Sequence, residues 1–282
     1  MLGKLIRHEW RSMWRIPTLL IAGLFAAAVL SGVTSGSSVF RYVSGGTAEN
    51  EILQILNAIL VVTFFLMLAA CSMGIFLYLS VHFYRKMYSD EGYLTHTLPV
   101  TVHQILISKI IVMVCWILLN ALAVLASGVV FGGLVIWGSG QVSPEELAQI
   151  AETIGEVLSH IDWTEMATLL LSALLGILYS VLMIVGAMSL GQLASRHRIL
   201  LSVVAYFGIS TLFSSIANAV QMHWLGDWIL SNVGILSGVT GPLLAFNMML
   251  GIAGTGSLMM LLGCVVLYMG SVYINSRRLN LE

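Results

Sequence analysis

Residues 52–80 decide the fold: ILQILNAILVVTFFLMLAACSMGIFLYLS. This stretch contains no Asp, Glu, Lys or Arg, and its most polar side chains are those of Gln54 and Asn57. A helix needs about 20 apolar residues to cross the hydrocarbon core of a bilayer. The stretch also lacks the alternation of polar and apolar residues that marks a membrane β-strand. It therefore predicts a transmembrane helix.

Five further apolar runs of the chain are also long enough to cross a bilayer as helices. Hydrophobic residues make up 59% of the 282-residue chain and charged residues only 9%, against roughly 25% charged residues in a soluble domain. The sequence predicts an all-α integral membrane protein, a single transmembrane domain over 1–282 with six transmembrane helices. The five further spans are expected at about 17–40, 105–137, 166–194, 198–221 and 255–275.

The positions of the basic residues predict the orientation of these spans. Lys and Arg close to span ends remain on the cytoplasmic side of a membrane. All twelve except Arg41 fall on one side of the six-span arrangement, and six acidic residues share one loop on the other side. Both termini are therefore expected in the cytoplasm. The basic residues on the cytoplasmic side are Lys4, Arg7, Arg11, Arg15, Arg85, Lys86, Lys109, Arg196, Arg198, Arg277 and Arg278.

A seventh apolar segment, WILSNVGILSGVTGPLLAFNMMLG at 228–251, is not expected to cross the membrane. A seventh span would place one of the two last basic pairs outside. Several glycines and Pro242 interrupt the segment, and interrupted backbone at membrane depth is tolerated only against protein or a water-lined cavity. We expect two short re-entrant helices that enter from the outside and return.

The residue inventory argues against several classes of function. Away from their ends, the predicted spans contain no Asp, Glu, Lys or Arg. Ion-coupled transporters and proton relays usually need such residues within the membrane. The only Gly-Lys pair, Gly3-Lys4, is not followed by Ser or Thr, so the chain has no phosphate-binding loop of an ATPase. His82, His96 and His103 lack the tight spacing of metal ligands. We therefore expect no catalytic residue, no metal and, from a net charge of −1, no nucleic-acid partner.

Residues 1–16 predict a helix that lies in the membrane interface. Four basic residues repeat at close to four-residue spacing, and apolar residues occupy the other side of the helix. Such a helix binds anionic headgroups with its basic face, and Pro17 is expected to mark the turn into the first span. An ordinary basic flank of a span is the alternative. The apolar side is formed by Leu2, Leu5, Ile6, Trp10, Met13, Trp14 and Ile16.

The polar segment 83–104, in FYRKMYSDEGYLTHTLPVTVHQILISK, is far longer than the about two to eight residues that join neighbouring helices. Gly92 is expected to end a short helix, and Thr101 with Gln104 to begin the next span as a capping box. Lys109 is expected to extend its ammonium group toward the interface. Four aromatic side chains are expected on the surface of this segment, which suits docking to a soluble partner: Phe83, Tyr84, Tyr88 and Tyr93.

These features resemble the membrane subunits of bacterial ATP-binding-cassette exporters of the ABC-2 type, which implies a location in a bacterial plasma membrane. The likeness lies in the basic start, the six spans and the motif DEGYLTHTLPVTVHQILISKI. It implies an interfacial helix at 1–16, a coupling helix within 83–104 that binds a separate ATPase, and re-entrant helices at 228–251. It also implies that ATP and magnesium are bound by two copies of that ATPase, with no cofactor on this chain. The coupling contacts it implies are Met87, Tyr88, Asp90, Glu91, Gly92 and Tyr93, with Thr97, Leu98 and Pro99 at the return.

The resemblance further implies pairing with a second copy of this chain through the first and fifth spans. Small residues four apart let helices approach closely. Two such stripes are candidates for the dimer contact or the wall of the transport pathway, and packing inside one subunit is the alternative for both. They are Ala28, Gly32 and Gly36 in the first span, and Ser202, Tyr206, Ser210, Ser214 and Asn218 in the fifth.

Residues 138–165 predict an amphipathic helix on the outer side. Ser143 and Glu146 form a capping box, with Pro144 at the first helical position. The acidic face, Glu145, Glu152 and Glu156, either covers the exit as a lid that attracts cationic amphipathic cargo or simply covers its own subunit. The expected cargo is an amphipathic peptide such as a toxin or an antimicrobial peptide. The alternatives are hydrophobic drugs or lipid-linked molecules, and a membrane scaffold or sensor that transports nothing.

Overall fold

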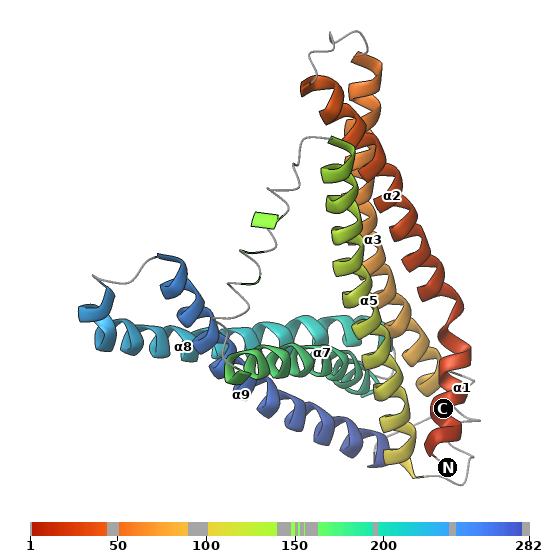
Figure 1. Ribbon diagram of the computed structural model, residues 1–282. Helices are drawn as coiled ribbons and strands as arrows, with labels where there is room; N and C mark the ends of the chain where they lie inside the picture. The colour runs from red at the N-terminus through yellow and green to blue at the C-terminus, as the bar shows by residue number, and fades with distance from the viewer. Residues whose placement is uncertain are drawn as a thin grey trace. The chain divides into compact units, whose positions relative to one another are not determined.

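The described part of the chain is helical throughout in the computed structural model. The structure describes residues 2–43, 51–89, 101–139, 148–149, 152, 155, 163–193, 197–236 and 241–277. Within these ranges, seven long helices follow one another and no strand occurs, which confirms the predicted all-α class (Figure 1). The helices are α1 Leu2–Met13, α2 Arg15–Val43, α3 Glu51–Tyr88, α5 Val102–Ser139, α7 Trp163–Gly191, α8 Arg198–Leu236 and α9 Gly241–Arg277.

Six of these helices are long and apolar enough to cross a membrane, as the hydrophobic runs predicted. α3 and α5 have 38 residues each, so at 1.5 Å per residue each is about 57 Å long. A bilayer core of about 30 Å therefore leaves several turns of both helices for the interface and beyond. The spans are Arg15–Ser37, Gln54–Tyr88, Val102–Gly138, Met166–Gly191, Arg198–Trp228 and Gly251–Ser276.

The helices form two compact units, each with its own packing. The first unit contains residues 3–82 and 115–160, and the second contains residues 83–114 and 161–282. The boundary between the units falls inside α3 and inside α5, so each of these helices contributes to both units.

In the first unit, α2 approaches α5 through glycines. A Cβ atom at Gly36 would lie 2.8 Å from Cα of Gly138 and 2.7 Å from the backbone oxygen of Leu134. No side chain fits in that space, so glycine is required for this approach of the two backbones. Aromatic packing joins α3 to α5 in the same unit, where the rings of Phe64 and Phe131 stack with centroids 4.7 Å apart.

In the second unit, α7 is the central helix. It packs against both α8 and α9, and its residues 181–187 are all buried. The ring of Tyr179 in α7 packs on that of Phe213 in α8, with centroids 4.6 Å apart. The inner face of α7 is apolar, as expected for a helix that is surrounded by other spans.

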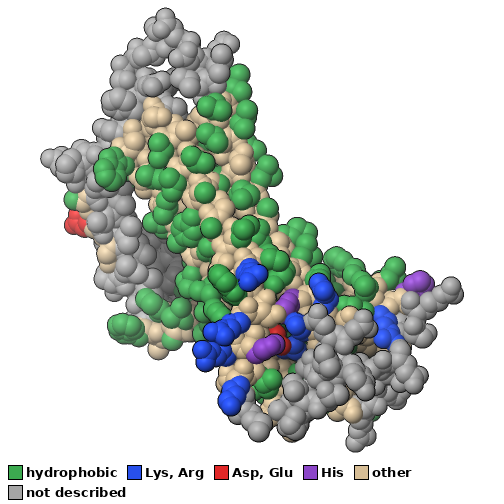
Figure 2. Space-filling view, turned by 90° about the vertical axis from the view of Figure 1, so that its right-hand side faces the viewer, with side chains coloured by type: hydrophobic (Ala, Val, Ile, Leu, Met, Phe, Trp, Pro, Cys, Tyr) green, Lys and Arg blue, Asp and Glu red, His purple; other side chains and the backbone are tan. Residues whose placement is uncertain are grey.

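Large hydrophobic side chains cover the outward faces of the spans. Leu19, Val129 and Leu212 are 72%, 75% and 68% exposed, respectively, and apolar side chains cover much of the described surface in Figure 2. Water would make such a surface costly, whereas acyl chains solvate it at no such cost. The exposed apolar faces therefore agree with a multi-pass membrane protein.

Three local expectations have different outcomes. The capping of α5 is confirmed, because the backbone N–H of Gln104 lies 3.4 Å from Oγ1 of Thr101. The turn before the first span is at Trp14 rather than at Pro17, which lies inside the first turn of α2, where a proline is tolerated because its missing N–H has no partner to lose. The re-entrant helices remain a prediction: residues 228–236 continue α8, residues 241–251 begin α9, and 237–240 lie outside the described residues.

Candidate functional site at the loop-flanking ends of α3 and α5

The first two of the predicted coupling residues, Met87 and Tyr88, lie in the last turn of α3. Met87 and Tyr88 are 0% and 7% exposed, and Phe83 one turn earlier is 1% exposed. The expectation that Phe83 and Tyr88 are surface aromatics is therefore wrong, because both side chains turn inward, while Tyr84 is half-buried. Tyr93 and the other expected coupling residues lie outside the described residues. They are Asp90, Glu91, Gly92, Thr97, Leu98 and Pro99.

The Tyr88 hydroxyl group belongs to a buried hydrogen-bonded triad with Ser189 and Asn275. It donates to Oδ1 of Asn275 at 3.0 Å and lies 2.9 Å from Oγ of Ser189. Nδ2 of Asn275 donates to Oγ of Ser189 at 3.2 Å, which closes the triangle. The Ser189 hydroxyl is also within 2.8 Å of the backbone oxygen of Val185. Each of the three side chains thus has hydrogen-bond partners within the triad.

The triad joins the ends of three helices. Tyr88 is the last residue of α3, Ser189 precedes the end of α7 by two residues, and Asn275 precedes the end of α9 by two residues. A buried polar group without a partner is costly, so the three groups hold the helix ends in register. The sequence carried one signal for this site, a lone Asn at the end of an apolar span, which the search for ionisable residues passed over.

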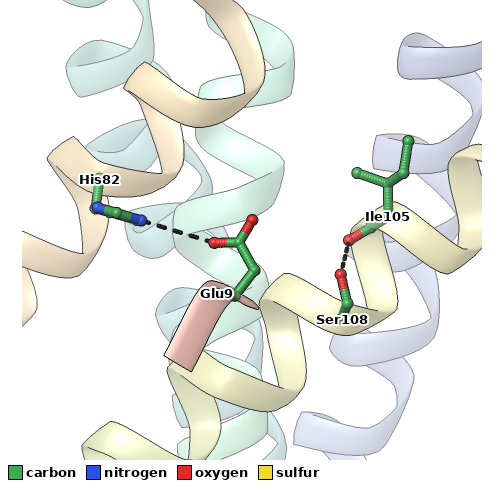
Figure 3. Close-up of polar contacts among 4 residues, drawn as sticks. All are labelled: Glu9, His82, Ile105 and Ser108. Carbon is green, nitrogen blue, oxygen red and sulfur yellow. Dashed lines mark hydrogen bonds and ion pairs between the residues drawn. The ribbon is translucent and has the colours of Figure 1, made fainter. Parts of the chain in front are cut away.

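The start of α5 carries a second set of polar side chains. Nδ1 of His103 lies 3.1 Å from the Tyr268 hydroxyl of α9. Lys109 is 1% exposed, so the expectation that its ammonium group extends to the interface is wrong: its side chain is enclosed by protein. Its neighbour Ser108 donates to the backbone oxygen of Ile105 at 2.7 Å (Figure 3), the usual way in which a hydroxyl is satisfied inside an apolar helix.

The N-terminal helix α1 contacts α3 and α5 within the first unit. The Glu9 carboxylate oxygen Oε2 lies 3.7 Å from Nε2 of His82 in α3 (Figure 3), and each of these side chains is only 11% exposed. The Trp10 ring stacks on that of Trp116 in α5, with centroids 4.8 Å apart. Glu9 is an acidic residue among the four basic residues of 1–16. This was the sequence feature that could have indicated the contact, and the interpretation of the helix from its basic residues alone missed it.

The basic residues of α1 face away from these contacts. Lys4, Arg7 and Arg11 are all exposed, and so is Arg15 at the start of α2. The amphipathic helix predicted over 1–16 thus exists as α1, and its position in the membrane interface remains a prediction.

The two stripes of small residues have different surroundings. Ala28, Gly32 and Gly36 of α2 are buried, and a Cβ atom at Gly32 would lie 2.9 Å from Cβ of Leu134. This stripe therefore packs against α5 of the same chain. Such packing within one subunit was the alternative to a dimer contact. In α8, Ser202 is buried, Tyr206 and Ser210 are half-buried, and Ser214 and Asn218 are exposed.

Only part of the segment 138–165, which the sequence predicts on the outer side, is described. Ala148, Gln149, Glu152 and Gly155 are helical and exposed. Glu145 and Glu156, the other two members of the predicted acidic face, lie outside the described residues. Glu152 is thus the one member of that face whose exposure is known.

Comparison with known proteins adds no relative. No protein-family model, no curated protein and no solved structure matches the chain. The resemblance to ABC-2 exporters therefore rests on the sequence features described above.

Proposed function

We propose that this chain is the membrane subunit of an ATP-driven exporter, which receives the work of a separate ATPase through the segment 83–104. The observation that carries this proposal is the triad of Tyr88, Ser189 and Asn275. It attaches Tyr88, which belongs to the segment and is the last residue of α3, to two other helices, α7 and α9. A displacement of the segment therefore acts on three helices at once.

The length of the helices supports the same proposal. α3 ends and α5 begins within the segment 83–104, and both helices have 38 residues. Helices transmit a displacement along their axis because every backbone group is bonded within the helix. Force applied at 83–104 would therefore be transmitted to the far side of the membrane along the two uninterrupted helices α3 and α5.

The proposed assembly contains two copies of this chain and two copies of a cytoplasmic ATPase that binds ATP and magnesium. The exposed part of the α8 stripe, Ser214 and Asn218, is the surface that we assign to the second copy. The proposed cargo is an amphipathic peptide, with hydrophobic drugs or lipid-linked molecules as the alternative. The apolar spans and the acidic outer segment with Glu152 favour a cationic amphipathic molecule.

A scaffold or sensor is the second candidate function. The triad holds the end of α3 in place, and a firmly held docking segment also suits a protein that only recruits a partner. The two functions differ in whether the partner hydrolyses ATP in response to cargo.

The deciding experiment searches for an ATPase that co-purifies with the full chain, reconstitutes the two together and measures ATP hydrolysis with and without cationic amphipathic peptides. Stimulated hydrolysis supports the peptide exporter. An ATPase that binds but ignores peptides retains the exporter and rejects the cargo, and the absence of any ATPase partner leaves the scaffold. The double variant Glu91→Ala with Tyr93→Ala should lose the stimulation, whereas Thr95→Ala in the same segment should keep it. Equal behaviour of the two variants would reject the assignment of the coupling contacts.

A further inference from the structure

The inward side of α1 is already covered by protein. Met13 and Glu9 are 1% and 8% exposed, and Leu5 and Ile6 on the same side are half-buried. The contact of Glu9 with α3 and the stack of Trp10 on α5 hold this side of α1 against the first unit. An amphipathic helix inserts into a bilayer with its apolar side. The side of α1 that could insert is therefore largely occupied.

The outward side of α1 is cationic. Lys4, Arg7 and Arg11 are exposed, and at 3.6 residues per turn they lie about 160° to 220° around the helix axis from Glu9. Arg15, at the start of α2, is exposed as well. None of these four side chains is in an ion pair with another described residue. Glu9, the one acidic residue of α1, is turned inward. The four basic residues, named here the N-terminal basic face, thus present positive charge without a compensating carboxylate on α1.

The N-terminal basic face adjoins the start of the first span, which begins at Arg15. Trp14 and Ile16 on either side of Arg15 are each 48% exposed, and tryptophan is enriched at the level of the lipid headgroups. Arg11 lies four residues before Arg15, about 6 Å along a helix, and Lys4 lies at most about 17 Å away. The potential of an anionic membrane surface falls off within a Debye length, about 8 Å. Arg11 and Arg15 are therefore the members of the face nearest the lipid phosphates.

We propose that the N-terminal basic face binds the phosphate groups of anionic bilayer phospholipids. The attachment is electrostatic rather than by insertion, because α3 and α5 hold the apolar side of α1. The exposed apolar side chains of Trp14 and Ile16 beside Arg15 favour a membrane over an acidic soluble partner. Each basic residue close to an anionic surface raises the affinity about fivefold. The surface rests on α1 and the first span alone and holds whether or not the chain exports anything.

The first test measures lipid selectivity at α1 itself. Ser12→Cys, at an exposed position of α1, carries a bimane fluorophore on the full chain in mixed micelles, which are titrated with nitroxide-labelled phosphatidylglycerol or phosphatidylcholine. We expect phosphatidylglycerol to quench at a lipid fraction at least about fivefold lower than phosphatidylcholine does. Salt at about 1 M, where the Debye length is about 3 Å, should remove this difference.

Two controls accompany the titration. Val129→Cys, which is 75% exposed in α5, should be quenched equally by both lipids, and the unaltered chain sets the background from the three native cysteines. Equal quenching by the two lipids at Ser12→Cys would overturn the proposal. A preference that about 1 M salt leaves unchanged would indicate apolar insertion and would also overturn it. Quenching by neither lipid would turn the face toward an acidic soluble partner and overturn the membrane as its ligand.

The second test separates charge from shape. Arg7→Gln, Arg11→Gln and Arg15→Gln combined in the bimane-labelled protein should abolish the preference for phosphatidylglycerol. Lysine at the same three positions retains the charge and should keep the preference. Arg11→Gln alone should reduce the preference about fivefold and serves if the triple variant does not fold. An unchanged preference in the glutamine variants would assign it to other basic residues of the chain and contradict the site.

Discussion

The Tyr88 hydroxyl donates a hydrogen bond to Oδ1 of Asn275 at 3.0 Å, across 187 positions of sequence. The bond joins the last residue of α3 to the end of the last span. Tyr88 was expected to face a partner protein, and its side chain instead lies among α3, α7 and α9. A displacement of the segment that follows Tyr88 must therefore move or break this contact.

Replacing Tyr88 by Phe should lower the free energy of unfolding by about 1 to 2 kcal/mol, because it leaves the Ser189 and Asn275 side chains partly unpaired. Thermal unfolding in detergent measures the change. Tyr84→Phe is the matched control: its ring lies 6.0 Å from that of Tyr88, and its hydroxyl makes no hydrogen bond within the described part of the chain. Equal stability of both variants would mean that the triad contributes nothing.

Replacing Gly36 by Ala should destabilise the first unit by about 1 to 3 kcal/mol, the usual effect of excess volume in a packed site. The new methyl group would lie 2.8 Å from Cα of Gly138, which is backbone and cannot rotate away. Gly128→Ala in α5 is the control, because nothing lies within 4 Å of its new methyl group. This control should be neutral or stabilising by up to about 1 kcal/mol, since alanine is the better helix former. A Gly36→Ala protein as stable as Gly128→Ala would contradict the close approach of α2 and α5.

Replacing Trp10 by Ala should release α1 from α5, because it removes the stack on Trp116. A stack of this kind contributes about 1 kcal/mol, so trypsin should cleave at Arg7 and Arg11 about fivefold faster. Trp14→Ala is the control, since Trp14 is 48% exposed and lies in the turn after α1. Equal acceleration in both variants would show that general loosening, rather than the stack, exposes α1.

The orientation predicts opposite labelling of two cysteine variants. Arg85→Cys in the last turn of α3 should react with a membrane-impermeant maleimide only after permeabilisation of the cells. Gly155→Cys in the outer segment should react in intact cells, and both positions are exposed in the structure. The unaltered chain, whose three cysteines lie within the spans, sets the background. Labelling of Arg85→Cys in intact cells would invert the predicted topology.

Local sequence patterns determined the number and position of the spans. Residues 52–80, for example, became the middle of α3, because a run of apolar residues longer than the hydrocarbon core specifies a transmembrane helix without reference to any other part of the chain. The cap of α5 was equally local, since Thr101 acts on the N–H of a residue three positions later. The amphipathic pattern of residues 1–16 likewise specified α1, which ends at Met13, three residues before the predicted end.

Tertiary structure alone decided which face of each span turns inward. In a soluble helix a polar stripe marks the outer face, but lipid and protein interior are similarly apolar, so the spans carry no such mark. The burial of Lys109, the contact of Gly36 with α5 and the inward position of Tyr88 each depend on residues far away in the chain. The sequence by itself therefore determined how many helices are long and apolar enough to cross a membrane, whereas the packing of distant helices determined which of their side chains meet.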